Sequence, residues 1–120
     1  MTAQQPLTSR RSSSRVLFAR DTLLSEAASS RLEPVREVLC EPTRTQIVRL
    51  LSRGPLSVGA LAGILKRSKS ATSQHLRVLR DGGVVAGRRR GRTVIYSLVS
   101  DPMIEATVEV LDRASALSAA

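Results

Sequence analysis

The chain has 120 residues and carries 19 Lys and Arg against 10 Asp and Glu, a formal net charge of +9. This length predicts one domain, and no stretch approaches the ~18 apolar residues of a membrane span. One Cys, one Phe, one Tyr and no Trp argue against a disulfide framework, a multi-cysteine metal site and an aromatic platform for stacking bases.

The positive charge lies mainly in the middle of the chain. Residues 34–100 carry 13 Lys and Arg against three acids, a net +10, whereas residues 1–33 carry +2 and residues 101–120 carry −3. Such a local concentration is the expected electrostatic footprint of a protein that binds nucleic acid.

We expect residues 1–20 to form a disordered basic arm, because they are rich in Ser, Thr and Arg and contain no acid. The segment lacks the ~7–15-residue apolar run of a secretory signal. An organellar transit peptide has a similar composition and stays open as an alternative. A basic arm could also touch phosphates.

Residues 21–40 predict a short extra helix and then a first core helix, since Pro34 interrupts the apolar spacing. The next helix begins at Pro42, a residue favoured in the first helical turn. Ser57 is a good N-cap for a short helix that ends at Leu65. The helix that begins at Pro42 is expected to bury a stripe formed by Ile47, Leu50 and Leu51. The apolar positions of the helix that ends at Leu65 are Val58, Leu61, Ile64 and Leu65.

Ser68 can cap a further helix that runs to about Asp81, where two glycines supply a left-handed stop. Only about three residues join it to the preceding helix, which fits a helix-turn-helix. On a wheel of about 100° per residue, the inward-facing positions are Ala71, Thr72, Leu76, Val78 and Leu79. The polar arc of this helix consists of Lys69, Ser70, Ser73, Gln74, Arg77 and Arg80.

Two strands are predicted next, over Val84–Arg88 and Thr93–Val99, joined by a turn in which Gly91 supplies a positive φ. Four arginines fall in or beside this turn: Arg88, Arg89, Arg90 and Arg92. Because like charges repel, this arginine cluster stabilises a fold poorly but suits a phosphate strand or a minor groove. Asp101 and Pro102 then begin a last helix with a broad apolar face.

The polar arc has the chemistry that base reading in the major groove requires. Gln pairs bidentately with adenine, Arg with guanine, and Ser with base edges or phosphate. A solvated helix face is the alternative for such a helix taken alone, and the adjoining arginines favour DNA. The predicted major-groove residues are Lys69, Ser70, Ser73, Gln74 and Arg77. The predicted contacts to phosphate or minor groove are Arg89, Arg90 and Arg92.

Three segments carry motifs. Residues 39–44 are LCEPTR, residues 70–85 are SATSQHLRVLRDGGVV and residues 89–98 are RRGRTVIYSL. In this order they resemble the L-x-D/E-P-T-R, S-x-x-S-x-H-L-x-x-L-x-x-x-G-L-V and R-x-G-R-x-x-x-Y-x-L patterns of the ArsR/SmtB winged helix-turn-helix transcriptional repressors of bacteria and archaea. The resemblance covers residues 33–112.

The resemblance implies a mainly α fold with a β-hairpin wing, a winged helix-turn-helix. We expect this domain to span residues 21–116, followed by a tail over residues 117–120. The resemblance also implies a repressor that is cytoplasmic and nucleoid-associated. Such a repressor forms a homodimer through its first and last helices and binds an inverted repeat in double-stranded promoter DNA. The last helix also favours a dimer, since Ile104, Val108 and Leu111 on a monomer would each forfeit roughly 1.5–3 kcal/mol by staying in water.

Many members of this family sense metals, and neither of two common ligand sets is present. The stretch corresponding to a Cys-x-Cys site, 58–65, has no Cys, and the last helix has no His. Its acidic residues are Asp101, Glu105, Glu109 and Asp112. Carboxylates alone suit zinc poorly, so we predict neither a metal site of these kinds nor a cofactor.

Cys40 and His75 remain as candidates for chemistry. Cys40 matches a small residue of the opening motif, which predicts a buried thiol. The alternative is redox sensing, helped by Arg36 and Arg44, each four residues away. His75 falls in the apolar arc, which favours packing or phosphate contact. With one Cys and one His, no conventional nucleophile and base can be paired outside the recognition helix, so we predict no enzyme.

We therefore predict a sequence-specific repressor that acts as a homodimer, contacts no membrane, and responds to a small-molecule or redox effector that the sequence does not identify. Two other classes stay open. A non-specific architectural nucleic-acid binder shares the charge but needs no polar arc. A winged helix that binds another protein needs no arginine cluster.

Overall fold

The computed structural model describes residues 5–119, with side chains from residue 13 onward. The chain divides into two compact units, one ending at Ser30 and the other beginning at Arg31. The first four residues of the expected arm and the last residue of the expected tail lie outside the described residues.

The described residues of the N-terminal unit form helix α1 (Gln5–Arg20) and all but the last residue of helix α2 (Glu26–Arg31). Helix α1 occupies the segment for which the sequence predicts disorder. A proline lies in its first turn and no glycine or further proline follows, so its backbone is compatible with a helix. Every side chain from 13 to 27 is exposed and α2 buries no residue. The core unit therefore begins at Arg31 rather than at the expected residue 21.

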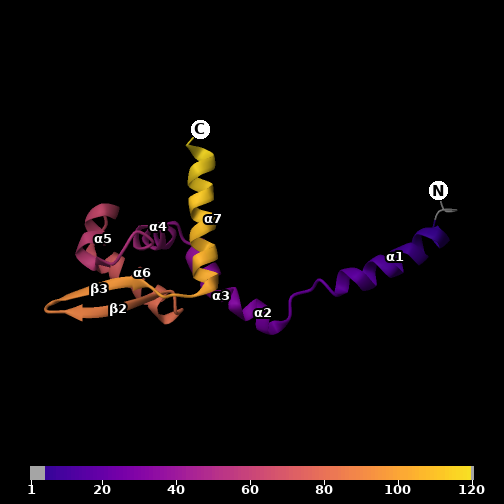
Figure 1. Ribbon diagram of the computed structural model, residues 1–120, viewed down its shortest axis with the longest axis horizontal. Coiled ribbons are helices and arrows are strands. Elements are labelled where there is room, and N and C mark those ends of the chain that lie inside the picture. Colours follow the sequence, from indigo (N-terminus) through magenta and orange to yellow (C-terminus); the bar gives the residue numbers. More distant parts are fainter. Residues whose placement is uncertain (1–4, 120) are drawn as a thin grey trace. The chain divides into compact units, whose positions relative to one another are not determined.

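The helices of the core unit are α3 (Glu33–Leu39), α4 (Pro42–Leu51), α5 (Val58–Leu65), α6 (Lys69–Asp81) and α7 (Pro102–Ser118) (Figure 1). They confirm the helices predicted from the sequence. Ser57 Oγ accepts from the Ala60 amide at 3.0 Å, and Ser68 Oγ accepts from the Ala71 amide at 3.0 Å. Both are the predicted N-caps. Gly83, with φ 76°, provides the predicted stop after α6.

A three-stranded antiparallel sheet runs in the order β1 (Leu56–Ser57), β3 (Thr93–Leu98), β2 (Val85–Arg90). The predicted hairpin is confirmed, with Gly91 at φ 64° in its turn. Strand β2 extends through Arg90, so two arginines placed in the turn by the sequence are strand residues. The sequence does not predict β1, because two residues are too few to show alternation.

An aliphatic core joins the helices to the sheet, as the scarcity of aromatic residues predicts. Its largest fully buried side chains are Ile47, Leu61, Leu76, Leu79, Val38, Val48, Val84 and Thr72. The Thr72 hydroxyl donates to the Ser68 carbonyl at 2.9 Å, so its buried polar group is satisfied. Tyr96 is partly buried and packs against the edge of this core.

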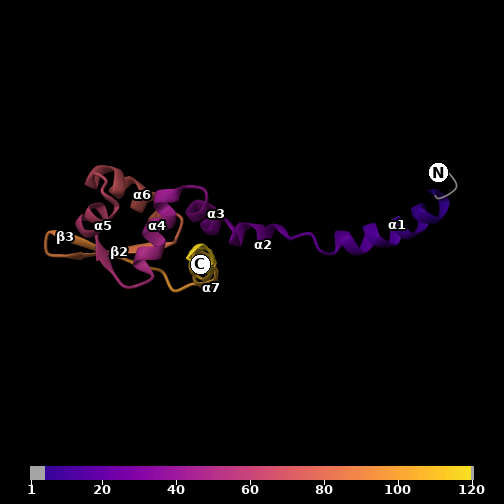
Figure 2. The same ribbon diagram turned by 90° about the horizontal axis from the view of Figure 1, so that it is seen from above.

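The packing of helix α7, which Figure 2 shows end-on, does not support the sequence-based argument that a monomer would leave its apolar face in water. Ile104 and Leu111 are only 4% and 8% exposed, because they pack into the core of their own chain. A monomer therefore does not leave them in water. The large exposed apolar side chains of α7 are Val110 and Leu117, at 56% and 76%. The helix also continues to Ser118, past the predicted domain end.

Candidate nucleic-acid interface

A tight turn joins α5 to α6. Lys66 has φ 56°, the left-handed conformation that ends many helices. The Arg67 amide donates to the Ala62 carbonyl at 3.0 Å, and Ser68 then caps α6. This is the predicted helix-turn-helix. Because lysine occupies the position where glycine is usual, the sequence carries no glycine to mark the turn.

Helix α6 separates buried from exposed side chains largely as its wheel predicts, except that Val78, which the wheel places inward, is 37% exposed. Thr72, Leu76 and Leu79 have no exposed surface. The five predicted groove residues are all exposed: Lys69, Ser70, Ser73, Gln74 and Arg77. Within the part of the chain whose side chains are described, the side chains of these five residues form no hydrogen bond or ion pair with other protein groups. Their polar groups are therefore accessible to a ligand.

Lys69 differs from the other four in the direction of its side chain. A Cβ placed on Gly59 would lie 3.6 Å from Lys69 Cε and 3.9 Å from Nζ, so the lysine runs over the first turn of α5. The ammonium adds to the positive end of the α5 dipole. This combination suits a phosphate oxygen better than a base edge.

The β2–β3 hairpin carries the arginine cluster on both faces. Arg88 pairs with Ile95 and Arg89 with Val94 in the register of the two strands. Since side chains alternate along a strand, Arg88 and Arg90 project from one face and Arg89 from the other. All four arginines, with Arg92 in the turn, are exposed.

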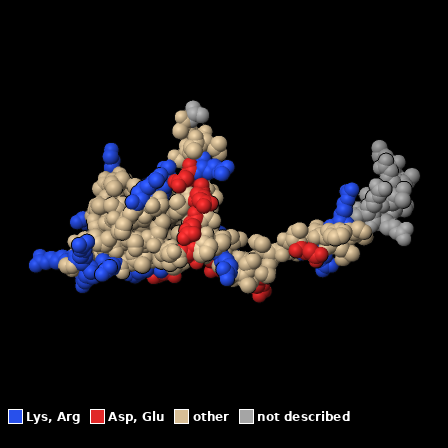
Figure 3. All heavy atoms as spheres, in the orientation of Figure 1, with Lys and Arg blue, Asp and Glu red and all other residues tan. Residues whose placement is uncertain are grey.

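The hairpin tip of the core unit is rich in positive charge, and the acidic side chains of helix α7 lie away from this tip. The hairpin tip points away from α7 in both ribbon views (Figures 1 and 2). Lys and Arg atoms gather at this tip in Figure 3, whereas acidic atoms run along α7. The charge asymmetry counted along the sequence is therefore also an asymmetry in space.

Gly87 allows the strands to pack closely at the base of the arginine cluster. It pairs with Tyr96, and a Cβ on Gly87 would lie 3.1 Å from Tyr96 Cε1 and 3.2 Å from Val94 Cγ1. The tyrosine ring therefore covers the glycine. This close approach accounts for a glycine inside a strand, where it is otherwise unfavourable.

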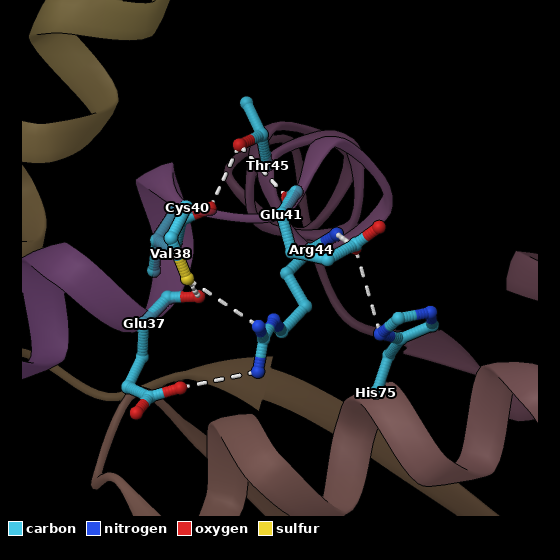
Figure 4. Close-up of polar contacts among 7 residues, drawn as sticks. All are labelled: Glu37, Val38, Cys40, Glu41, Arg44, Thr45 and His75. Carbon is cyan, nitrogen blue, oxygen red and sulfur yellow. Dashed lines mark hydrogen bonds and ion pairs between the residues drawn. The ribbon is translucent and has the colours of Figure 1, made fainter.

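A polar cluster connects the end of α3 to α6 (Figure 4). Arg44 Nη1 lies 3.1 Å from Glu37 Oε2, and Arg44 Nη2 donates to Cys40 Sγ at 3.5 Å. Glu41 Oε2 accepts from the Arg44 amide at 2.9 Å and lies 3.6 Å from His75 Nδ1. Cys40 is exposed, so the expectation of a buried thiol is wrong. His75 lies beside a carboxylate rather than in purely apolar packing.

Glu41 is the N-cap of α4, which the sequence does not predict. The hydrogen bond from the Arg44 amide holds the pKa of Glu41 below its ordinary value, and the nearby His75 lowers it further. Because the pKa is lower in the folded protein, the cap stabilises the fold above the unfolded-state pKa. That stabilisation is lost as the pH falls through the folded-state pKa.

Among residues 5–119, no group of three His, Cys, Asp or Glu side chains is placed to hold a metal ion. The acidic Asp112 of α7 instead pairs with Arg49 of α4, with Nε and Oδ1 3.2 Å apart. No helix within the same range is long and apolar enough to cross a bilayer.

The sequence is similar to known transcriptional regulators. A family profile described as "Bacterial regulatory protein, arsR family" matches residues 41–86. The regulator NmtR of Mycobacterium tuberculosis is 40% identical over 75 residues, 62% of each chain. The transcriptional activator HlyU of Vibrio cholerae is 38% identical over 88 residues, 73% of this chain and 81% of HlyU. The transcriptional repressor SmtB homolog of Synechocystis is 40% identical over 75 residues, 62% of this chain and 57% of that protein.

The fold is also similar to a solved structure. HlyU from Vibrio cholerae N16961 superposes with a TM-score of 0.67 and 34% identity, over 75% of this chain and 96% of HlyU. The chain spans about six-tenths of the length of NmtR and of the SmtB homolog. The matched segments cover the helix-turn-helix described above.

Proposed function

Since the chain belongs to the arsR family of bacterial regulatory proteins, it is a DNA-binding transcriptional regulator, and we propose that it represses transcription by binding an inverted-repeat operator as a homodimer. One observation carries the proposal: the exposed polar arc of α6 lies in the same compact unit as the exposed arginine hairpin. A helix of this kind fits the major groove and a basic hairpin fits the adjacent backbone or minor groove. A dimer bound at a promoter would deny that DNA to the polymerase.

The residues of the interface divide into two roles. Ser70, Ser73, Gln74 and Arg77 would contact base edges. Lys69, with the first turn of α5, would contact phosphate, and the hairpin arginines Arg89, Arg90 and Arg92 would contact phosphate or the minor groove. Phosphate contacts supply affinity and register, whereas base contacts supply sequence preference.

The dimer is supported by a second apolar stripe on α7. Its positions recur at three- or four-residue spacing, as in a helix–helix seam: Met103, Ala106, Val110, Ala114 and Leu117. Val110 and Leu117 are exposed, and a second copy of α7 would cover them. A two-fold dimer then uses the same surface on both protomers and can place two α6 helices about one DNA turn, ~34 Å, apart.

The decisive experiment is selection of bound sequences from a random DNA pool, followed by competition between selected and random duplexes at one salt concentration. The proposal expects an inverted repeat that is preferred by about 10³-fold or more. Equal affinity for random duplexes would instead identify a non-specific architectural binder. Absence of DNA binding would favour a winged helix that binds protein.

Arg90→Ala is expected to weaken binding to operator and random duplexes alike, because a phosphate contact carries no sequence information. The slope of log K against log salt concentration should flatten by roughly one. Titrations at several salt concentrations measure it. Arg113→Ala is the matched control, since Arg113 is exposed on the acidic helix α7 and should leave the slope unchanged. Equal effects of the two substitutions would reject the assignment of Arg90.

Cys40 offers a second mode of regulation, and we propose it as the alternative to a small-molecule effector. The exposed Sγ is held by the same Arg44 guanidinium that pairs with Glu37. Hydrogen peroxide would transfer one oxygen atom to this thiol, giving a sulfenic acid and water. The added oxygen would disturb the polar cluster that connects α3, α4 and His75 of α6.

Cys40→Ser is expected to bind DNA normally but to lose any peroxide-dependent release. DNA affinity measured before and after treatment with peroxide, and again after reduction by a thiol, checks this. Met103→Leu is the control, because methionine is the other readily oxidised side chain in the core unit. Release that persists in Cys40→Ser and disappears in Met103→Leu would contradict the redox role of Cys40.

A further inference from the structure

We propose that helix α1 is a second DNA contact, which binds backbone phosphates without reading sequence. The inference rests on the proposed operator binding and adds a surface outside the winged-helix unit. It assigns a role to a segment that packs none of its described side chains into a core.

All charged residues of α1 are positively charged. Its 16 residues include four arginines and no Asp or Glu, and the side chains of Arg15 and Arg20 are exposed. A helix of this length extends about 24 Å. Duplex DNA presents one negative charge per ~1.7 Å of axis, so on the order of 14 phosphate charges lie along that distance. The positive charge of α1 is therefore complementary to a phosphate backbone of this charge density.

The apolar side chains of α1 do not form the face that another kind of partner would need. Val16, Leu17 and Phe18 are 54%, 61% and 75% exposed. They are consecutive, so they point in directions about 100° apart. A helix that lies on a membrane or pairs with a second helix needs an apolar stripe along one side. The arrangement favours a partner recognised by charge alone.

The acidic helix α7 is a weaker partner than DNA for these arginines. Of its exposed or half-buried acids, Asp112 is already paired with Arg49 at 3.2 Å. Glu105 and Glu109 remain to balance four arginines. The phosphate backbone offers a far higher density of negative charge.

The test replaces all four arginines with glutamine in the full chain: Arg10→Gln, Arg11→Gln, Arg15→Gln and Arg20→Gln. DNA affinity is measured across a salt series on a random-sequence duplex of about 40 base pairs, four helical turns. The slope of log K against log salt concentration should become less steep by about 3 to 4. DNA affinity should also fall more than tenfold at about 0.1 M salt. Thermal unfolding should be unchanged, because these residues lie outside the core unit. Leu17→Ala with Phe18→Ala is the matched control and should leave affinity and slope unaltered.

Each other outcome overturns a defined part of the inference. An unchanged slope, with the Arg90→Ala effect still present, rejects the role of α1 and leaves the proposed function standing. Higher affinity in the glutamine variant would place the arginines on the acidic face of α7 and also reject it. Equal losses in the apolar double variant would indicate packing rather than charge. If the native chain binds no DNA, the proposed function itself fails.

Discussion

Replacing Gln74 with alanine is expected to reduce discrimination at one base position of each half-site by about 1–3 kcal/mol, a factor of about 5 to 150. Gln74 is exposed on α6, so the substitution removes a donor and an acceptor without disturbing the core. Affinity for the operator should fall, whereas affinity for random duplexes should hardly change because the phosphate contacts remain. Dissociation constants for the operator and its single-base variants, at one salt concentration, measure this.

Gln46→Ala is the matched control for Gln74→Ala. Gln46 is also exposed, but it lies on α4, outside the proposed interface, and its loss should leave sequence preference intact. Equal loss of affinity for operator and random DNA in Gln74→Ala would remove Gln74 from base reading. It would then belong with the phosphate contacts.

Leu76→Ala should destabilise the protein by about 2–5 kcal/mol, the usual cost of truncating a buried leucine. Leu76 has no exposed surface and lies in the central cluster of the core. Folded domains are stable by only about 5–15 kcal/mol in total, so the loss is a large share. The variant should bind DNA only in proportion to its folded fraction. Urea unfolding at fixed protein concentration, followed by circular dichroism, measures the change.

Two control substitutions test whether the destabilisation by Leu76→Ala comes from the loss of buried volume. Leu76→Met nearly conserves volume and should cost less than about 1.5 kcal/mol. Val78→Ala removes an apolar group on the same helix that is 37% exposed, and it should have a much smaller effect. A Leu76→Ala protein as stable as Val78→Ala would mean that α6 is not anchored through this side chain.

Much of the interface could be predicted because its signals are local. The two faces of α6 follow from a 3.6-residue repeat, and Ser57 and Ser68 mark the starts of α5 and α6 through hydrogen bonds spanning three residues. Gly91 marks the hairpin turn for the same kind of reason, since its positive φ is a property of that position. The family motifs, one of which includes Gly91, led to the resemblance that the comparisons confirm.

The predictions from sequence failed where the exposure of a side chain depends on which other elements pack against it. Helix α7 has two apolar stripes, and only the tertiary fold shows that Ile104 lies in the core while Val110 stays exposed. The environment of Cys40 likewise depends on Arg44 and Glu37, which belong to different helices.

The amino-acid sequence was therefore sufficient for the order of the helices of the core unit, the hairpin, the polar arc of α6 and the family, since hydrogen bonds and side-chain periodicity act over a few residues. Only the tertiary structure decided which stripe of α7 is left for a partner and that Cys40 is exposed. These features depend on how whole elements pack against one another, and no local pattern encodes such packing.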